Sequence, residues 1–350
     1  RYNVEYSESA YRKPYKAYKQ GVKDSVTQDD IAHQMYELEK KKKQSSIERS
    51  IARADIRDTA IREKFYEDIT NAVENLPNLP SVPSFDRKWV KTPENHYIVA
   101  MGDLHYKGDK EWLEEKMARV EEEVVNFMVK KGLKDITIIE LGDTIDGGAL
   151  RPSQLMALKL GMVDQAIEVS EYYARMLNNV QNKTGGFVNF GIVTSSNHTE
   201  LRPLNTKRKE LVEEDMMKVI AKYIELRLSD NSMINVFKDK HLRFQSGDNR
   251  FVAGHGDTGG MTPNTLIKHA TELDSYYRYN ADYFFFGHYH HYLETTMNSN
   301  KGKNRKAFLI PSLAGEVESY EERNLLGSEG GFSIFAFNKN GHQETKHVRV

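Results

Sequence analysis

Five short segments of this chain each place aspartate, asparagine or histidine directly after an apolar run of strand length. In chain order they are Gly102–His105, Gly142–Asp146, Ser196–His198, Gly254–Asp257 and Gly287–His290. Core packing selects apolar residues, so it does not account for polar residues at five successive strand ends. Because the carboxyl ends of strands in an α/β sheet form its functional crevice, the pattern predicts an α/β fold that gathers these segments together.

The elements around these segments alternate between strand and helix, which is the pattern of an α/β domain. We expect strands at His96–Met101, Asp135–Leu141, Phe187–Thr194, Arg250–Ala253, Asp282–Phe286, Ala307–Pro311 and Phe332–Phe337. We expect helices at Lys110–Lys131, Ser153–Gln181, Arg208–Arg227 and Pro263–Tyr277.

The residue types in the five segments are those of a metal centre. Side chains of a strand alternate between two faces, so Asp103 and His105 share one face, and so do His288 and His290. Carboxylate, amide and imidazole groups suit Mn, Fe or Zn. Two such ions about 3.5–4 Å apart can clamp a phosphoryl group. A single aspartate before a turn is usually a cap, and a lone His-Gly pair such as His255-Gly256 is often a turn, but five segments together favour ligands.

The order GDxH, GDxxD, NH, H and GHxH resembles the calcineurin-like metallophosphoesterases, over about residues 96–315. Within that superfamily, the sequence bears a general resemblance to the DNA repair exonuclease branch. The resemblance implies a four-layer α/β/β/α sandwich of two mixed sheets, here with an N-terminal helical extension. It also implies two divalent metal ions, with Mn as the first choice and Fe, Zn or Mg as alternatives.

The resemblance also implies a role for each residue of the segments. Asp103, His105 and His290 would hold the first ion, and Asn197, His255 and His288 the second. Asp143 would bridge the two ions, and a hydroxide held between them would attack phosphorus. His198 would be the general acid, and Asp146 would orient it.

Two positions depart from the family pattern. Ser196 stands where the family usually has glycine before the Asn-His pair, and we expect little effect from so small a residue. Gly147 follows Asp146, whereas the serine/threonine phosphatases of the family carry a phosphate-binding arginine there. The missing arginine speaks against a protein phosphatase.

These observations favour a phosphodiesterase, most of all a nuclease that acts on DNA or another nucleic acid. Arg202 and Arg208 follow the third segment and could contact the substrate backbone, or they could belong to a solvated helix start. Basic and tyrosine residues alternate between Tyr11 and Lys23, as in stacking surfaces for nucleic acid, although a solvated helical face explains them as well.

Two alternatives stay open. The first is a phosphomonoesterase or a small-nucleotide phosphodiesterase, which a pocket closed by the Ser153–Gln181 helix would favour over an open groove. The second is a non-catalytic scaffold with the same fold. The intact ligand residues argue against a scaffold.

The rest of the chain suggests its organisation and compartment. Residues 1–76 predict a helical extension that could form a homo-oligomer. Residues 77–95 predict a linker, with three prolines between Leu76 and Pro83, and residues 96–350 predict the catalytic domain. The chain lacks cysteine, which excludes thiol catalysis and zinc–thiolate sites and favours the cytoplasm. With 50 basic and 51 acidic residues, any attraction to nucleic acid must be local. There is no apolar stretch of membrane-spanning length.

Overall fold

The computed structural model describes residues 26–80, 94–147, 158–200, 215–260, 262–297, 304–315 and 330–350. The chain divides into two compact units, Arg1–Asp68 and Ile69–Val350. The second unit carries both sheets and all five of the segments singled out above.

A single helix, α2, runs for 49 residues from Val26 to Glu74. Its sequence contains neither glycine nor proline, and such a run of charged residues and alanines sustains a helix. Pairs four residues apart add support, such as Lys64 and Asp68, whose Nζ and Oδ1 atoms lie 2.8 Å apart. Within residues 1–76, where the sequence predicts a helical extension, this helix covers Val26–Glu74.

The first sheet has six strands. Their spatial order is β11 (Gly341–Arg349), β10 (Gly331–Asn338), β1 (His96–Met101), β2 (Asp135–Glu140), β3 (Phe187–Val193) and β4 (Ile234–Asp239). Strands β1 to β4 are parallel to one another, whereas β10 is antiparallel to both of its neighbours. The carboxyl ends of β1, β2 and β3 therefore lie along the same edge.

The second sheet has five strands. Their spatial order is β5 (Leu242–Ser246), β6 (Asn249–Gly254), β7 (Tyr283–Phe286), β9 (Lys306–Leu309) and β8 (Leu293–Thr296). Strands β6, β7 and β9 are parallel, and the two outer strands are antiparallel to them. Both sheets are mixed, as the resemblance implied.

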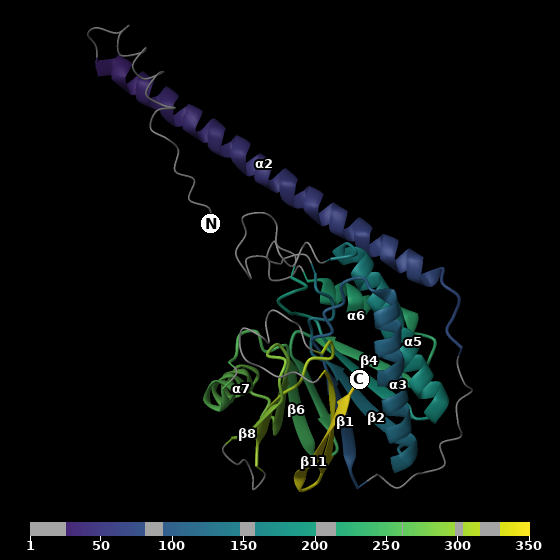
Figure 1. The fold of residues 1–350 in the computed structure, drawn as a ribbon. Coiled ribbons are helices and arrows are strands. Elements are labelled where there is room, and N and C mark those ends of the chain that lie inside the picture. Colours follow the sequence, from purple (N-terminus) through teal and green to yellow (C-terminus); the bar gives the residue numbers. More distant parts are fainter. Residues whose placement is uncertain are drawn as a thin grey trace. The chain divides into compact units, whose positions relative to one another are not determined.

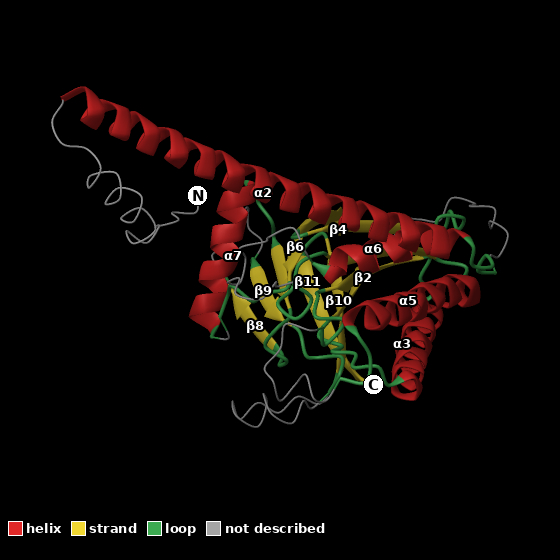
Figure 2. Ribbon diagram, turned by 90° about the horizontal axis from the view of Figure 1, so that it is seen from above, coloured by secondary structure: helices red, strands yellow, loops and turns green. Residues whose placement is uncertain are grey.

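The two sheets pack face to face over an aromatic core that includes Phe251, Phe285, Phe308 and Phe335, all fully buried. Helices cover the outer faces (Figure 1 and Figure 2). They are α3 (Lys110–Lys131), α5 (Met162–Thr184) and α6 (Met216–Arg227) on the six-stranded sheet, and α7 (Pro263–Tyr277) on the five-stranded sheet. The fold is therefore the predicted α/β/β/α sandwich.

Several elements differ from the sequence prediction. Helix α5 begins at Met162 rather than Ser153, because Gly161 is its N-cap, and residues 148–157 lie outside the described part. Helix α6 begins at Met216, with Asp215 as its N-cap. Strands β4, β5, β8 and β11 were not predicted, because exposed and charged side chains interrupt their apolar pattern.

Among the residues described, no helix has the length and apolar character needed to cross a membrane.

Candidate metal centre

The loops after β1 and β2 continue to pair where the two strands end. The amide of Asp103 donates to the carbonyl of Gly142 at 2.9 Å, and the amide of His105 donates to the carbonyl of Asp143 at 3.0 Å. The side chain of Asp103 reaches the other sheet, where its Oδ2 accepts from the amide of His288 at 2.8 Å. These bonds fix segments from both sheets against one another.

The backbone is strained at the predicted ligands. Five of them have positive φ angles: Asp103 (54°), His105 (50°), Asp143 (50°), His288 (75°) and His290 (58°). Left-handed backbone costs a residue with a Cβ about 1 kcal/mol or more. Such strain gathers at functional sites, where the orientation of a side chain matters more than local stability.

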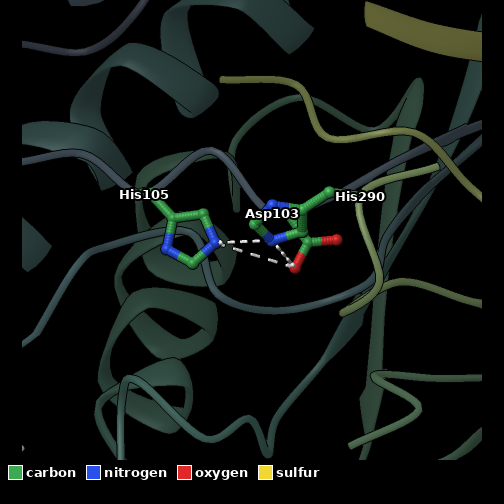
Figure 3. A group of neighbouring side chains, drawn as sticks. All are labelled: Asp103, His105 and His290. Atoms are coloured by element: carbon green, nitrogen blue, oxygen red, sulfur yellow. Dashed lines mark hydrogen bonds and ion pairs between the residues drawn. The ribbon is translucent and has the colours of Figure 1, made fainter. Parts of the chain in front are cut away.

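The first cluster consists of Asp103, His105 and His290 (Figure 3). The Nε2 atoms of the two histidines lie 3.1 Å apart, and Asp103 Oδ1 lies 3.9 Å from that of His105 and 3.6 Å from that of His290. Although Asp103 Oδ1 is buried, it has no hydrogen-bond partner among the described residues. A buried carboxylate oxygen needs a partner, and a cation between these three atoms would supply one.

The second cluster consists of Asp143, His255 and His288, with Asn197 beside them. A carbonyl only accepts, so the 3.0 Å contact to Leu141 O places a proton on Nδ1 of His255. Its Nε2 faces Oδ2 of Asp143 at 2.9 Å and Oδ1 of Asn197 at 2.8 Å. This donor set of two oxygens and imidazole nitrogen also fits a divalent ion.

Charges within the second cluster govern its protonation. Burial opposes a charge on His255, but the carboxylates of Asp143 and Asp103 outweigh it and raise the pKa of His255 to about 10. In the metal-free protein a proton on Nε2 therefore satisfies both facing oxygens. Burial and the charge of His255 lower the pKa of His288 to about 4, so its ring is neutral and can ligate.

His198 lies beside both clusters. Its Nδ1 is 3.1 Å from the carbonyl of Asp146 and 3.1 Å from Oδ1 of the same residue, so Nδ1 carries a proton. Burial lowers the pKa of His198, but Asp143 and Asp146 more than offset it, and the pKa lies above its ordinary value. The backbone amide of His198 donates to Oδ1 of Asp143 at 2.9 Å.

The structure thus brings together all nine residues to which the resemblance gave a role in metal binding or proton transfer. They are Asp103, His105, Asp143, Asp146, Asn197, His198, His255, His288 and His290. The predicted substrate contacts Arg202 and Arg208 lie outside the described residues, as does the basic segment from Tyr11 to Lys23.

Sequence reasoning gave no role to three buried polar residues next to the site: Ser196, from which it expected little effect, and Thr199 and Asp215, which it did not single out. They hydrogen-bond to one another and to the amide of Asp143. Only Ser196 gave a signal, as a departure from the family glycine. Asp215 could have been recognised as a helix N-cap, but its contact with the site depends on the tertiary fold.

The chain is 29% identical, over 346 residues, to the SPbeta prophage-derived uncharacterized protein YonJ of Bacillus subtilis (strain 168). That match covers 93% of this chain and 84% of the relative. No model of a known protein family matches the chain.

Among solved structures, an archaeal phosphodiesterase aligns with a TM-score of 0.37 and 9% identity, covering 73% of this chain and 99% of that one. Zinc-bound Vps29 from Entamoeba histolytica aligns with a TM-score of 0.33 and 11% identity, covering 72% and 98%. Likenesses this weak say nothing of activity.

Proposed function

We propose that this chain is a calcineurin-like metallophosphoesterase that hydrolyses phosphodiesters with two divalent ions. The observation that carries the proposal is the pair of ligand clusters, Asp103–His105–His290 and Asp143–His255–His288, within one buried site. Asp143 also neighbours His105 and His198 in a third grouping of potential ligand atoms, which suits a carboxylate shared by both ions.

Each side chain has a distinct task in this proposal. Asp103, His105 and His290 would hold one ion, and His255, His288 and Asn197 the other, with Asp143 between them. Bound ions would neutralise the phosphate charge and activate water, with Mn²⁺ as our first choice. His198 would carry a proton on Nε2 toward the leaving oxygen, while Asp146 holds its Nδ1.

Gly147 supports a substrate other than a phosphoprotein. This residue has a φ of 72°, and a Cβ on it would lie 1.9 Å from the carbonyl oxygen of His198. No side chain fits there, so the phosphate-binding arginine of the related protein phosphatases has no place. Together with the basic and tyrosine residues between Tyr11 and Lys23, this favours nucleic acid, and we propose a nuclease.

Hydrolysis by the metal-free protein reloaded with Mn²⁺ tests the proposal. The substrates are bis-p-nitrophenyl phosphate, p-nitrophenyl phosphate, and labelled single- and double-stranded DNA, each also offered to His198→Ala. We expect metal-dependent cleavage of the diester and of DNA, reduced about 10²–10⁴-fold in the variant.

Other outcomes separate the alternatives. Turnover of the monoester alone would contradict the diesterase and indicate a phosphatase. Cleavage of the diester without DNA would remove the nuclease assignment and keep the diesterase. Two bound Mn²⁺ ions without any turnover would contradict the nuclease and indicate either a narrow small-molecule substrate or a binding scaffold.

A further inference from the structure

Three buried side chains form a hydrogen-bonded chain behind the metal centre. Ser196 Oγ accepts from the amide of Asp143 at 3.0 Å, and it lies 2.6 Å from Thr199 Oγ1. Thr199 Oγ1 donates to Oδ1 of Asp215 at 2.5 Å. All three residues are less than a tenth exposed, so water contributes little to these bonds.

Each hydrogen bond of this network has one possible direction. The Thr199 hydroxyl donates its single proton to Asp215, so the proton between the two hydroxyls must come from Ser196. Ser196 Oγ is then left with lone pairs for the amide of Asp143. The bonds thus run in one direction, from the Asp143 amide through two hydroxyls to the Asp215 carboxylate.

Asp215 is held as an acceptor on both oxygens. Besides Thr199, its Oδ1 accepts from the amide of Met217 at 2.9 Å, and its Oδ2 accepts from the amide of Ser196 at 3.0 Å. Oδ1 already accepts two bonds, so a proton on it would displace one of its donors. The same carboxylate is the N-cap of α6, so the hydrogen-bonded network is anchored at the start of a helix.

The hydrogen-bonded network reaches both sides of the Asn197–His198 segment. Ser196 precedes that segment and Thr199 follows it, and each is bound to Asp215. The amide of Met216 also donates to the carbonyl of Thr199 at 3.0 Å. The peptide that carries a predicted ligand and the predicted acid is therefore clamped at both ends.

We propose that Ser196, Thr199 and Asp215 form a positioning relay, which fixes the left-handed Asp143 and the Asn197–His198 segment in the geometry that binds the metals. The link to metal binding rests on the proposed function. Partners of this kind, one bond removed from a ligand, typically contribute about 10–100-fold to metal affinity. The serine in place of the family glycine thus has a structural role, because glycine has no hydroxyl to accept a hydrogen bond from the Asp143 amide.

Four variants separate the relay from simple packing. Ser196→Ala and Thr199→Val remove a hydroxyl with little change in volume, and Thr199→Ser restores it. Asp215→Asn keeps the helix cap but sets an amide donor against the Ser196 amide, because its oxygen must serve Thr199 and Met217. Ser170→Ala is the control, since Ser170 is an equally buried serine whose hydroxyl bonds to Ala166 O at 2.6 Å within α5.

The first readout is Mn²⁺ binding by isothermal titration. We expect the dissociation constant to rise about tenfold or more in Ser196→Ala, Thr199→Val and Asp215→Asn, and to stay near wild type in Thr199→Ser and Ser170→Ala. Unchanged Mn²⁺ affinity in the first three variants would overturn the relay. Activity is not needed for this readout, so a protein that binds Mn²⁺ but hydrolyses nothing would contradict only the proposed function.

The second readout needs no metal. Hydrogen exchange of the Asp143 amide, followed by NMR, reports the bond to Ser196 Oγ directly. We expect faster exchange in Ser196→Ala and Thr199→Val, with the control amides of β2 unchanged. If the wild-type protein bound no Mn²⁺, the two-metal function would fail, whereas the exchange experiment would still test the relay. Exchange of the Asp143 amide unaffected by these variants would overturn the relay.

Discussion

His198 Nδ1 lies 3.1 Å from Oδ1 of Asp146, and the same carboxylate oxygen lies 3.5 Å from Nδ1 of His105. One carboxylate thus faces a predicted acid and a predicted metal ligand at once. The contact with Nδ1 leaves Nε2 of His198 directed away from Asp146, where a leaving group could reach it.

Asp146→Asn should separate the charge of this carboxylate from its orienting role. Asparagine can still accept from Nδ1 of His198, but without the charge the pKa of His198 should fall. Because the acid must be protonated, we expect kcat to fall about tenfold at pH 8 and less at pH 6. A pH–rate profile measures this, with His198→Ala as the control that lacks the basic limb. A profile unchanged from wild type would contradict the role of Asp146.

Metal binding should release a proton from His255. Burial opposes the charge on its ring, but the carboxylates of Asp143 and Asp103 raise its pKa to about 10. Below that pH, Nε2 is therefore protonated in the metal-free protein. An ion can bind there only after the proton leaves, so Mn²⁺ affinity should increase with pH up to about 10. Titration calorimetry at pH 7.5 in buffers of different ionisation enthalpy should show about one proton released by this residue. The same proton count in His255→Gln as in wild type would contradict it.

Glu140→Gln should alter how the stability of the metal-free protein depends on pH. Burial raises the pKa of Glu140 from 4.5 to about 8, and its Oε2 accepts from the amide of Gly142 at 3.0 Å. Between these two values the unfolded chain has lost the proton that the folded chain retains. Stability therefore falls by about 1.4 kcal/mol per pH unit as pH rises.

In Glu140→Gln this contribution is absent, while the glutamine oxygen can still accept from Gly142. Urea unfolding from pH 5 to pH 8 should show a shallower decline than in wild type, and the variant should be the more stable protein at pH 8. Parallel curves for the two proteins would show that Glu140 is not held protonated.

Arg278→Gly should stabilise the protein. Arg278 is the C-cap of α7 with a φ of 51°, a conformation that glycine adopts without strain, and we expect a gain of about 0.5–1 kcal/mol. The matched control is Gly132→Ala at the C-cap of α3, where φ is 64° and a Cβ would meet nothing within 4 Å. Strain alone should then destabilise it by about 1 kcal/mol. Shifts of the unfolding midpoint with the opposite signs would contradict both expectations.

The sequence was sufficient to single out the predicted ligands because their segments follow apolar runs that form buried strands. Helices α3 and α7 have the predicted bounds, since Asp109 and Thr262 cap their starts and glycine or a left-handed residue ends them. The edge strands β4 and β11 could not be predicted, because their exposed side chains leave no apolar pattern. Register and pairing with a neighbouring strand define these elements, and only the assembled sheet provides that neighbour.

The support around the ligands was equally hidden from sequence reasoning. Asp215 is 16 residues from Thr199, so nothing local indicates that the two hydrogen-bond. The left-handed backbone of Asp103 and Asp143 also depends on pairing between two loops. Residue types at strand ends are readable from the chain, whereas the bonds that orient them arise from long-range contacts.

Anomalous scattering from a crystal of the protein equilibrated with Mn²⁺ tests the central claim most directly. The account predicts two Mn²⁺ peaks about 3.5–4 Å apart, with Asp143 in contact with both. One peak should lie against Asp103, His105 and His290, and the other against His255, His288 and Asn197. A single peak, or two peaks that do not share Asp143, would contradict the two-metal centre.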